Sequence, residues 1–274
     1  MHIKTIRAVT FSPAGKTKET AMRIVRELAQ VLRCPVAEDD ITLPQDRESV
    51  RTFEKDELAV FAFPTYAGRI PNKILPFLQT LFQGNSTPAV AVVTFGNRSF
   101  DESLKELCVE LHAHGFVPFA GAAFVCRHAM SKVLADDRPD SDDTEQMLSF
   151  ARDAAGKLTE ADGVPEMLHV FENAEVGPYY RPLEESGEPA NFLKAKPVTD
   201  QTLCDRCGIC VRVCPMGSID ENDVTKTPGI CIKCHACVRK CPTHAKYFDD
   251  PSLLSHIRML EHNFPRRAEN TVIL

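Results

Sequence analysis

CDRCGICVRVCP, residues 204–215, and CIKCHACVRKCP, residues 231–242, are two copies of one cysteine pattern. In each copy four cysteines are separated by two, two and three residues, and a proline follows the fourth. Each cysteine of the first copy recurs 27 residues later in the second. Eight of the eleven cysteines belong to the two copies, so the doubled pattern dominates the thiol chemistry of the chain.

The spacing within each copy is typical of ligands to a [4Fe–4S] cluster. Three cysteines two residues apart can bind three irons of one cube, and the fourth ligand comes from elsewhere. The two runs resemble those of bacterial two-cluster ferredoxins, in which the fourth cysteine of each run binds the other cluster. The resemblance implies two ligand sets, which are Cys204, Cys207, Cys210 and Cys241 for one cluster and Cys231, Cys234, Cys237 and Cys214 for the other.

Disulfides and zinc are the alternatives for these cysteines. Disulfide frameworks are typical of secreted chains, and the first ten residues resemble a strand rather than the apolar core of a signal peptide. Structural zinc sites use two close cysteine pairs with a longer spacer between them, which differs from this pattern. The three isolated cysteines, Cys34, Cys108 and Cys126, are expected to be small buried apolar residues.

Length and composition indicate a protein of two domains without a membrane span. The chain has 274 residues, 43% of them hydrophobic, and no apolar run reaches membrane-spanning length. A net charge of −6 disfavours nucleic acid as a partner. Oxygen-labile clusters without a targeting signal lead us to expect a cytoplasmic location, in an anaerobe.

Residues 1–160 alternate between strand-like and helix-like patterns. The predicted strands are 3–11, 58–63, 89–95 and 116–125, and the predicted helices are 16–32, 72–82, 101–114 and 142–158. Continuous apolar strands indicate burial on both faces of a parallel sheet. Asp101 is placed to cap the helix that begins there. The alternation predicts a doubly wound α/β domain with helices on both faces.

Three loops follow predicted strands and are expected to meet at the carboxyl edge of the sheet, where such domains bind ligands. The first, residues 12–17, opens a helix, and its backbone N–H groups suit a single phosphomonoester. Gly15-Lys16-Thr17 matches the end of a Walker A motif, but Thr10 stands where that motif needs glycine, which disfavours an NTPase. The candidate cofactor-binding residues of the three loops are Ser12, Ala14, Gly15, Lys16, Thr17, Pro64, Thr65, Tyr66, Ala67, Gly68, Thr94, Phe95, Gly96, Asn97 and Phe100.

The three loops resemble the phosphate loop and the two isoalloxazine loops of the flavodoxin family. The usual phosphate loop is Ser/Thr-x-Thr-Gly-x-Thr; Ser12, Gly15 and Thr17 match it. Ala14 stands where a hydroxyl residue is usual, and Lys16 would compensate for the missing hydrogen bond. The resemblance implies a five-stranded sheet that binds FMN. It also implies that Tyr66, together with Phe95 or Phe100, flanks the flavin ring, since the chain has no tryptophan.

As a whole, the chain resembles proteins of anaerobes that fuse a flavodoxin-like domain to a two-cluster ferredoxin. The implied organisation is a flavodoxin-like α/β domain at 1–160, a linker at 161–196, a small α+β ferredoxin domain at 197–248 and a C-terminal extension at 249–274. We expect the linker to pack partly on the first domain. Five basic residues flank the cluster ligands and would either offset cluster charge or form a solvated surface; they are Arg206, Arg212, Lys233, Arg239 and Lys240.

Two histidines stand near the predicted cofactor sites. His128 follows a predicted strand, and a hydrogen-bonded structural role is favoured over contact with flavin or substrate. His235 lies between two predicted ligands and is expected to pack beside its cluster rather than bind iron, because cysteines already supply four ligands.

The predicted function is electron transfer by an iron–sulfur flavoprotein. FMN exchanges one or two electrons and each cluster one, so the chain would couple one- and two-electron redox partners. Redox proteins, such as ferredoxin- or flavodoxin-type donors or an acceptor oxidoreductase, are the expected partners. One alternative is an FMN-dependent reductase of a small molecule that its own clusters feed, and another is a redox-sensing or scaffolding module. The sequence leaves open whether the protein is an enzyme and whether it forms a homodimer.

Overall fold

A computed structural model describes residues 1–171 and 174–274. In these residues one six-stranded sheet has the order β10-β7-β6-β4-β1-β2. Its strands are β1 (Thr5–Thr10), β2 (Val36–Asp40), β4 (Glu57–Pro64), β6 (Thr87–Phe95), β7 (Phe116–Val125) and β10 (Thr271–Ile273). Two two-stranded sheets pair β3 (Arg51–Phe53) with β5 (Phe82–Gly84) and β8 (Val198–Thr199) with β9 (Lys246–Tyr247).

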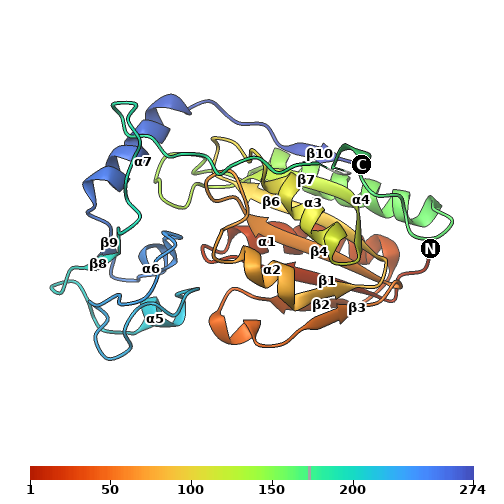
Figure 1. Cartoon of the computed structure of the whole chain (residues 1–274), viewed down its shortest axis with the longest axis horizontal. Coiled ribbons are helices and arrows are strands. Elements are labelled where there is room, and N and C mark those ends of the chain that lie inside the picture. Colours follow the sequence, from red (N-terminus) through yellow and green to blue (C-terminus); the bar gives the residue numbers. More distant parts are fainter. Residues whose placement is uncertain (172–173) are drawn as a thin grey trace.

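Seven α-helices and two short 3₁₀ helices complete the described part of the chain. The α-helices are α1 (Lys16–Leu32), α2 (Leu75–Leu81), α3 (Ser103–Ala113), α4 (Ser141–Glu160), α5 (Ile209–Arg212), α6 (Ala236–Arg239) and α7 (Pro251–Asn263). The 3₁₀ helices are η1 (Pro44–Arg47) and η2 (His169–Phe171). Figure 1 shows α1 to α4 beside the large sheet, with α5 and α6 in a separate small unit at one end of it.

The large sheet is parallel except at one edge. Strands β2, β1, β4, β6 and β7 pair in parallel, whereas β10 pairs antiparallel with β7, Val272 opposite Ala122. Without β10 the order is that of the flavodoxin-like doubly wound fold, in which the first strand lies between the second and the third. The expectation of five strands was therefore incomplete, because the C-terminal extension adds a sixth.

Two apolar cores cover the two faces of the sheet. On one face, α1 and α4 pack against each other and bury residues such as Ile24, Leu28 and Phe150. On the other face, α2 and α3 bury Leu78 and Leu107 against the strands. Strands β4, β6 and β7 carry almost continuous runs of buried residues, as strands covered on both faces require.

Two predicted helix starts are wrong. The helix expected from residue 72 begins at Leu75, because the residues before it form a turn closed by Pro71. The helix expected from Asp101 begins at Ser103, and no side chain of the described residues caps it at Glu102. Asp101 has a left-handed backbone and pairs with Arg98 instead of capping, so its carboxylate stabilises the preceding loop.

The segment after α4 runs back along the sheet domain, by which we mean residues 1–160. Leu168 and Phe171 join the core on the α3 face, and Tyr179 donates its hydroxyl to the carbonyl of Ile70 at 2.9 Å. Further on, Arg258 of α7 binds Glu185 at 2.7 Å. The segment therefore packs on the sheet domain first and on α7 afterwards (Figure 1), and its residues 172–173 lie outside the described residues.

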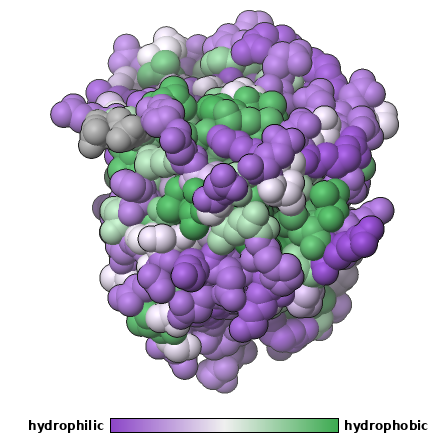
Figure 2. Space-filling view, turned by 90° about the vertical axis from the view of Figure 1, so that its right-hand side faces the viewer, coloured by the Kyte–Doolittle hydropathy of each residue, from purple (hydrophilic) through white to green (hydrophobic). Residues whose placement is uncertain are grey.

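Hydrophilic and apolar residues both appear on the end of the molecule away from the cysteine runs (Figure 2). The end of the sheet domain opposite α5 and α6 faces the viewer in Figure 2, and there a mainly hydrophilic surface is broken by separate apolar patches. No helix in the described ranges combines the length and apolar character needed to cross a bilayer.

A buried ion pair at the start of α4 is also hydrogen-bonded to the C-terminal extension, and its loss should destabilise the fold. Asp143 is fully buried, pairs with Arg138 and accepts from Asn270 Nδ2 at 2.8 Å. Replacing Asp143 by alanine leaves an unpaired buried guanidinium, so we expect a loss of about 3–5 kcal/mol in the free energy of unfolding. Denaturant unfolding measures it; Glu145→Ala, which removes the exposed partner of Arg152, should cost less than about 1 kcal/mol.

Candidate functional site

The eight cysteines of the two runs gather into two sets of four. One cavity is lined by Cys214, Cys231, Cys234 and Cys237. Another is lined by Cys204, Cys207, Cys210 and Cys241. We call them the inner and the outer cysteine set. Each combines three cysteines of one run with the fourth of the other, which is the crossed arrangement that the resemblance implied.

The geometry of the cysteines fits clusters better than it fits disulfides or zinc. All eleven cysteines, which lie within the described ranges, are free thiols. Nowhere in the described residues do three Cys, His, Asp or Glu side chains converge on the position of one metal ion. Four thiols spread around a cavity suit a cube with an iron at each of four corners, whereas zinc draws its ligands to a single point.

The two cysteine sets differ in their exposure to solvent. The outer set has one exposed member, Cys207, and one buried member, Cys210, whereas the inner set has two buried members, Cys234 and Cys237, and none that is exposed. Burial raises the pKa of Cys237 to about 12 and also raises the pKa of Cys234. Metal binding requires thiolates, so the inner thiols would lose their protons only to a metal centre that compensates the charge. The outer set is the one that faces solvent.

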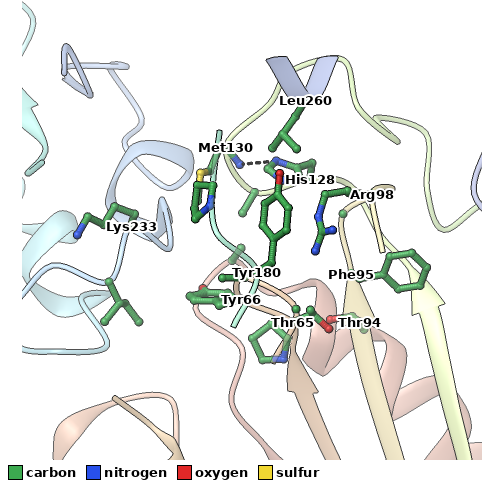
Figure 3. Close-up of a pocket in the computed structure, with 18 of the residues that line it drawn as sticks. Thr65, Tyr66, Thr94, Phe95, Arg98, His128, Met130, Tyr180, Lys233 and Leu260 are labelled. Carbon is green, nitrogen blue, oxygen red and sulfur yellow. Dashed lines mark hydrogen bonds between the residues drawn. The ribbon is translucent and has the colours of Figure 1, made fainter. Parts of the chain in front are cut away.

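A larger cavity opens at the carboxyl edge of the sheet. Its walls include residues of all three predicted loops, together with residues from distant segments (Figure 3). The predicted residues that line it are Ala14, Lys16, Thr17, Pro64, Thr65, Tyr66, Ala67, Gly68, Thr94, Phe95 and Gly96. The structure thus brings the three loops together at one site, as expected from their places after parallel strands.

The first loop presents the start of a long helix to this cavity. Gly15 precedes α1 with a left-handed backbone (φ 94°), a conformation that favours glycine. The first backbone N–H groups of α1, at Lys16 and Thr17, have no acceptor within the helix, so they suit an anionic group. The Lys16 ammonium lies 2.8 Å from Glu19, and Thr17 Oγ1 lies 2.7 Å from Thr94 Oγ1, which ties the first loop to the third.

Four of the predicted residues lie away from the lining of the large cavity. Ser12 Oγ accepts the N–H of Lys18 at 2.9 Å and, like Gly15, borders a neighbouring cleft. The Asn97 amide donates to the carbonyls of Phe264 and Arg266, both at 2.7 Å, and so anchors the C-terminal extension. Phe100 packs on the hydrophobic core, its ring 5.5 Å from that of Phe95. Of the two candidate ring-flanking phenylalanines, Phe95 is therefore the one that reaches the cavity.

Residues of the second cysteine run, which supplies three of the four inner-set cysteines, close one side of the cavity. Ile232 and Lys233, which lie between Cys231 and Cys234, are part of its lining. Figure 3 shows Lys233 on the side of the cavity opposite Phe95, with Tyr66 between them. Burial, followed by the charges of the nearby Cys234 and Cys231, raises the pKa of Tyr66 well above its ordinary value of 10.0. Tyr66 thus lies between the large cavity and the inner cysteine set.

The opposite wall comes from segments that the loop pattern alone did not indicate. The N–H of Tyr180 donates to Ala67 at 2.8 Å, and the Arg98 guanidinium lies 3.8 Å from the centre of the Tyr180 ring. His256 and Leu260 of α7 complete this wall. Arg98 and its neighbour Ser99 belong to the third loop, which follows the predicted strand 89–95, while Tyr180 and α7 are brought in by tertiary packing.

His128 lines the cavity and is held by its own loop. Its Nδ1 accepts the N–H of Met130 at 3.2 Å (Figure 3), which agrees with the hydrogen-bonded role favoured from sequence. A side chain at Gly96 would collide with the His128 ring, so glycine there permits the close approach. Burial, and then repulsion by His256, Arg239 and Arg98, lowers the pKa of His128 to about 4.

The lowered pKa of His128 predicts a pH dependence of stability. Between pH 6.5 and about 4 the unfolded chain binds a proton at His128 that the folded chain does not, so acidification over this range favours unfolding. We expect His128→Gln to reduce the stability lost between pH 7 and pH 5 by about 1–2 kcal/mol. Urea unfolding at the two pH values measures this, and equal losses in both proteins would contradict it.

Comparison with known proteins gives a family match for the cysteine-rich part of the chain and similar solved structures. Residues 196–242 match the family described as a 4Fe-4S dicluster domain, and no curated protein sequence matches the chain significantly. Three similar solved structures are a flavodoxin from the Archaea, the flavodoxin of Streptococcus pneumoniae TIGR4 and the apo form of an NADH:FMN oxidoreductase.

These structural likenesses are distant. Their sequence identities are 13%, 20% and 14%, their TM-scores 0.40, 0.38 and 0.41, and they cover 58%, 57% and 62% of this chain and 100%, 99% and 100% of the other. At this distance the fold assignment rests on the strand order of the sheet, and the cluster assignment on the cysteine runs and their family match. One chain therefore joins a flavodoxin-like α/β domain to a 4Fe-4S domain.

Proposed function

We propose that this protein is an electron conduit that binds FMN in the large cavity and one [4Fe–4S] cluster in each cysteine set. The observation that carries the proposal is the shared wall: Ile232 and Lys233 lie between inner-set cysteines and also line the cavity. Bound there, FMN would supply one- and two-electron chemistry and each cluster one-electron chemistry.

The residues of the cavity fit the two ends of FMN. Lys16 and the free N–H groups that open α1 offer a cationic, hydrogen-bonding site for a phosphate. Tyr66 and Ile232 toward the cysteine runs, and Phe95 on the opposite side, offer flat or apolar surface to an isoalloxazine ring (Figure 3). Ala14 leaves the phosphate site without one hydroxyl, and Lys16 supplies charge in its place.

The order of the three sites defines a path from the cavity to the surface. Tyr66 and Ile232 separate the cavity from the inner set, and a small apolar cluster that includes Cys210, Cys214 and Cys237 lies between the inner and outer sets. The outer set reaches solvent at Cys207. We infer that redox protein partners exchange electrons at the outer set, while the inner set serves the flavin.

Purification without oxygen tests the proposal. We expect one noncovalent FMN and about eight irons per chain, from two clusters of four. Reduction of the clusters by a two-electron donor should slow sharply when FMN is removed and recover when it is added back. Iron near four per chain, or a flavin without its phosphate, would contradict the proposal.

A reductase of a small molecule is the second candidate, because polar side chains also line the cavity. Arg98, Ser99 and His128 are part of this lining, where a substrate could approach the flavin. If this function holds, the reduced protein should be reoxidised by a small two-electron acceptor with saturation kinetics, and Arg98→Met should change KM. Reoxidation that shows no saturation would favour the conduit.

A further inference from the structure

Two side chains that line the inner cysteine cavity have buried polar atoms without a partner. His235 is 6% exposed, and its Nε2 has no hydrogen-bond partner in the described part of the chain. The Oγ1 atom of Thr227 is likewise buried without a hydrogen-bond partner among the described residues, and Thr227 lines the same cavity. Leaving a buried polar atom unsatisfied is costly, so such atoms indicate a missing partner.

The two copies of the cysteine run provide an internal comparison. His235 corresponds to Gly208, 27 residues earlier, and both have left-handed backbones, with φ of 58° and 70°. Glycine adopts this conformation without cost, whereas a side chain at this position is strained. A side chain at Gly208 would also come within 3.1 Å of Arg212 Nη1. The second copy therefore has a strained backbone at His235.

Part of the reason for a ring at this position is packing. The His235 ring stacks on that of Phe248, with 4.5 Å between centroids and 21° between planes. Stacking accounts for an aromatic side chain but not for its nitrogen, since a phenylalanine would stack as well. The ring nitrogen lies among the residues that border the inner cysteines, where a backbone N–H already donates to sulfur, from Ser218 to Cys214 Sγ at 3.3 Å.

We propose that His235 donates its Nε2 hydrogen to a sulfur of the inner cluster and thereby raises the reduction potential of that cluster relative to a site without the donor. Thr227 is a second donor to the same cluster. Hydrogen bonds to cluster sulfurs stabilise the more negative, reduced state. In the outer cavity the equivalent residue is Gly208, which has no side chain to donate a hydrogen bond. The donor at position 235 would therefore make the potentials of the two clusters differ. This inference rests on the proposed presence of an inner cluster.

Variants of His235 test the proposal through the potential of one cluster. His235→Phe keeps the stacked ring and removes the donor, and His235→Gly reproduces the first copy and relieves the backbone strain. Both should make reduction of one cluster about tenfold less favourable, a shift of about 59 mV to lower potential for one electron, and leave the other cluster unchanged. Asparagine tolerates the left-handed backbone and carries an N–H donor. The potential in His235→Asn should therefore be lowered less than in the two donor-free variants.

Two further measurements separate the hydrogen bond from packing and from folding. Phe248→Leu removes the stacking partner but keeps the nitrogen, and should leave most of the potential unchanged. In the unmutated protein with ¹⁵N-labelled histidine, electron–nuclear double resonance of the reduced cluster should show a coupled nitrogen that exchanges its hydrogen with deuterium. This second readout stands even if a variant fails to assemble.

Three outcomes are distinguishable. Unchanged potentials in both donor-free variants, with about eight irons retained, would overturn the role of His235 but leave the conduit intact. A protein that holds both clusters but shows no nitrogen coupling would likewise overturn the role of His235 and leave the conduit intact. About four irons in the unmutated protein would instead contradict the inner cluster itself, and with it the proposed function.

Discussion

Replacing Cys214 by alanine is expected to remove the cluster next to the flavin. Cys214 belongs to the first run in sequence but lines the inner cavity with Cys231, Cys234 and Cys237. Loss of one of four ligands should leave about four irons per chain. Because Ile232 and Lys233, which lie between inner-set cysteines, line the large cavity, electron exchange between FMN and the remaining outer cluster should fall by about two orders of magnitude or more, equivalent to about 2.7 kcal/mol in the barrier.

Cys241→Ala is the matched control for this experiment. Cys241 belongs to the second run but lines the outer cavity, so its loss should also leave about four irons per chain. Here the inner cluster remains, and the rate from photoreduced FMN to iron should stay close to that of the unmutated protein. Stopped-flow or flash measurements of flavin oxidation, with iron analysis of each sample, give both quantities. A slow Cys241→Ala together with a fast Cys214→Ala would contradict the crossed ligand sets.

The local patterns of the sequence were enough to predict most of the sheet domain. Helix α1 spans the residues expected from its apolar period, and β7 spans the predicted strand 116–125, because both bury long, regular runs. Strand β2 was not located, since Val36–Asp40 is an exposed edge strand in which three of five residues are acidic. Edge strands lack the continuous apolar run that marks a buried strand, so their pairing depends on the neighbour rather than on composition.

Contacts between distant segments set the limit of the sequence argument at the site. The three loops were predicted because each follows a parallel strand. The far wall was not, because Tyr180, His256 and Leu260 come from separate stretches whose local sequence carries no ligand signal. Asn97 illustrates the same limit: a polar residue in a flavin-type loop was a reasonable contact candidate, yet its amide holds the C-terminal segment through two carbonyls.

Arg239 should be the side chain on which the docking of the two domains depends most. Its guanidinium crosses from the second cysteine run to the loop after β7, where it donates to the carbonyls of Ala129 (2.8 Å), His128 (2.5 Å) and Ser131 (2.7 Å). Replacement by methionine keeps much of the apolar stem but removes all three donors. A hydrogen bond to a charged group contributes about 1.5–3 kcal/mol net, and the three bonds here share one part-buried guanidinium, so we expect a loss of about 2–5 kcal/mol in domain docking.

The repeated run again supplies the control, because Arg212 occupies the equivalent place in the first copy. Arg212 makes one bond, to the carbonyl of Cys207 in its own run at 3.1 Å, and this bond is exposed. Arg212→Met should therefore change stability by no more than about 0.5 kcal/mol.

Arg239→Met, in contrast, should slow electron transfer from FMN to the clusters by about tenfold or more, since each 1.4 kcal/mol lost from docking reduces the docked population tenfold once undocked states are populated. Transfer rates, with iron content as a check that both clusters remain, decide the matter. If both variants transferred electrons as fast as the unmutated protein, the contact between Arg239 and the His128 loop would not be what holds the inner cluster against the flavin cavity.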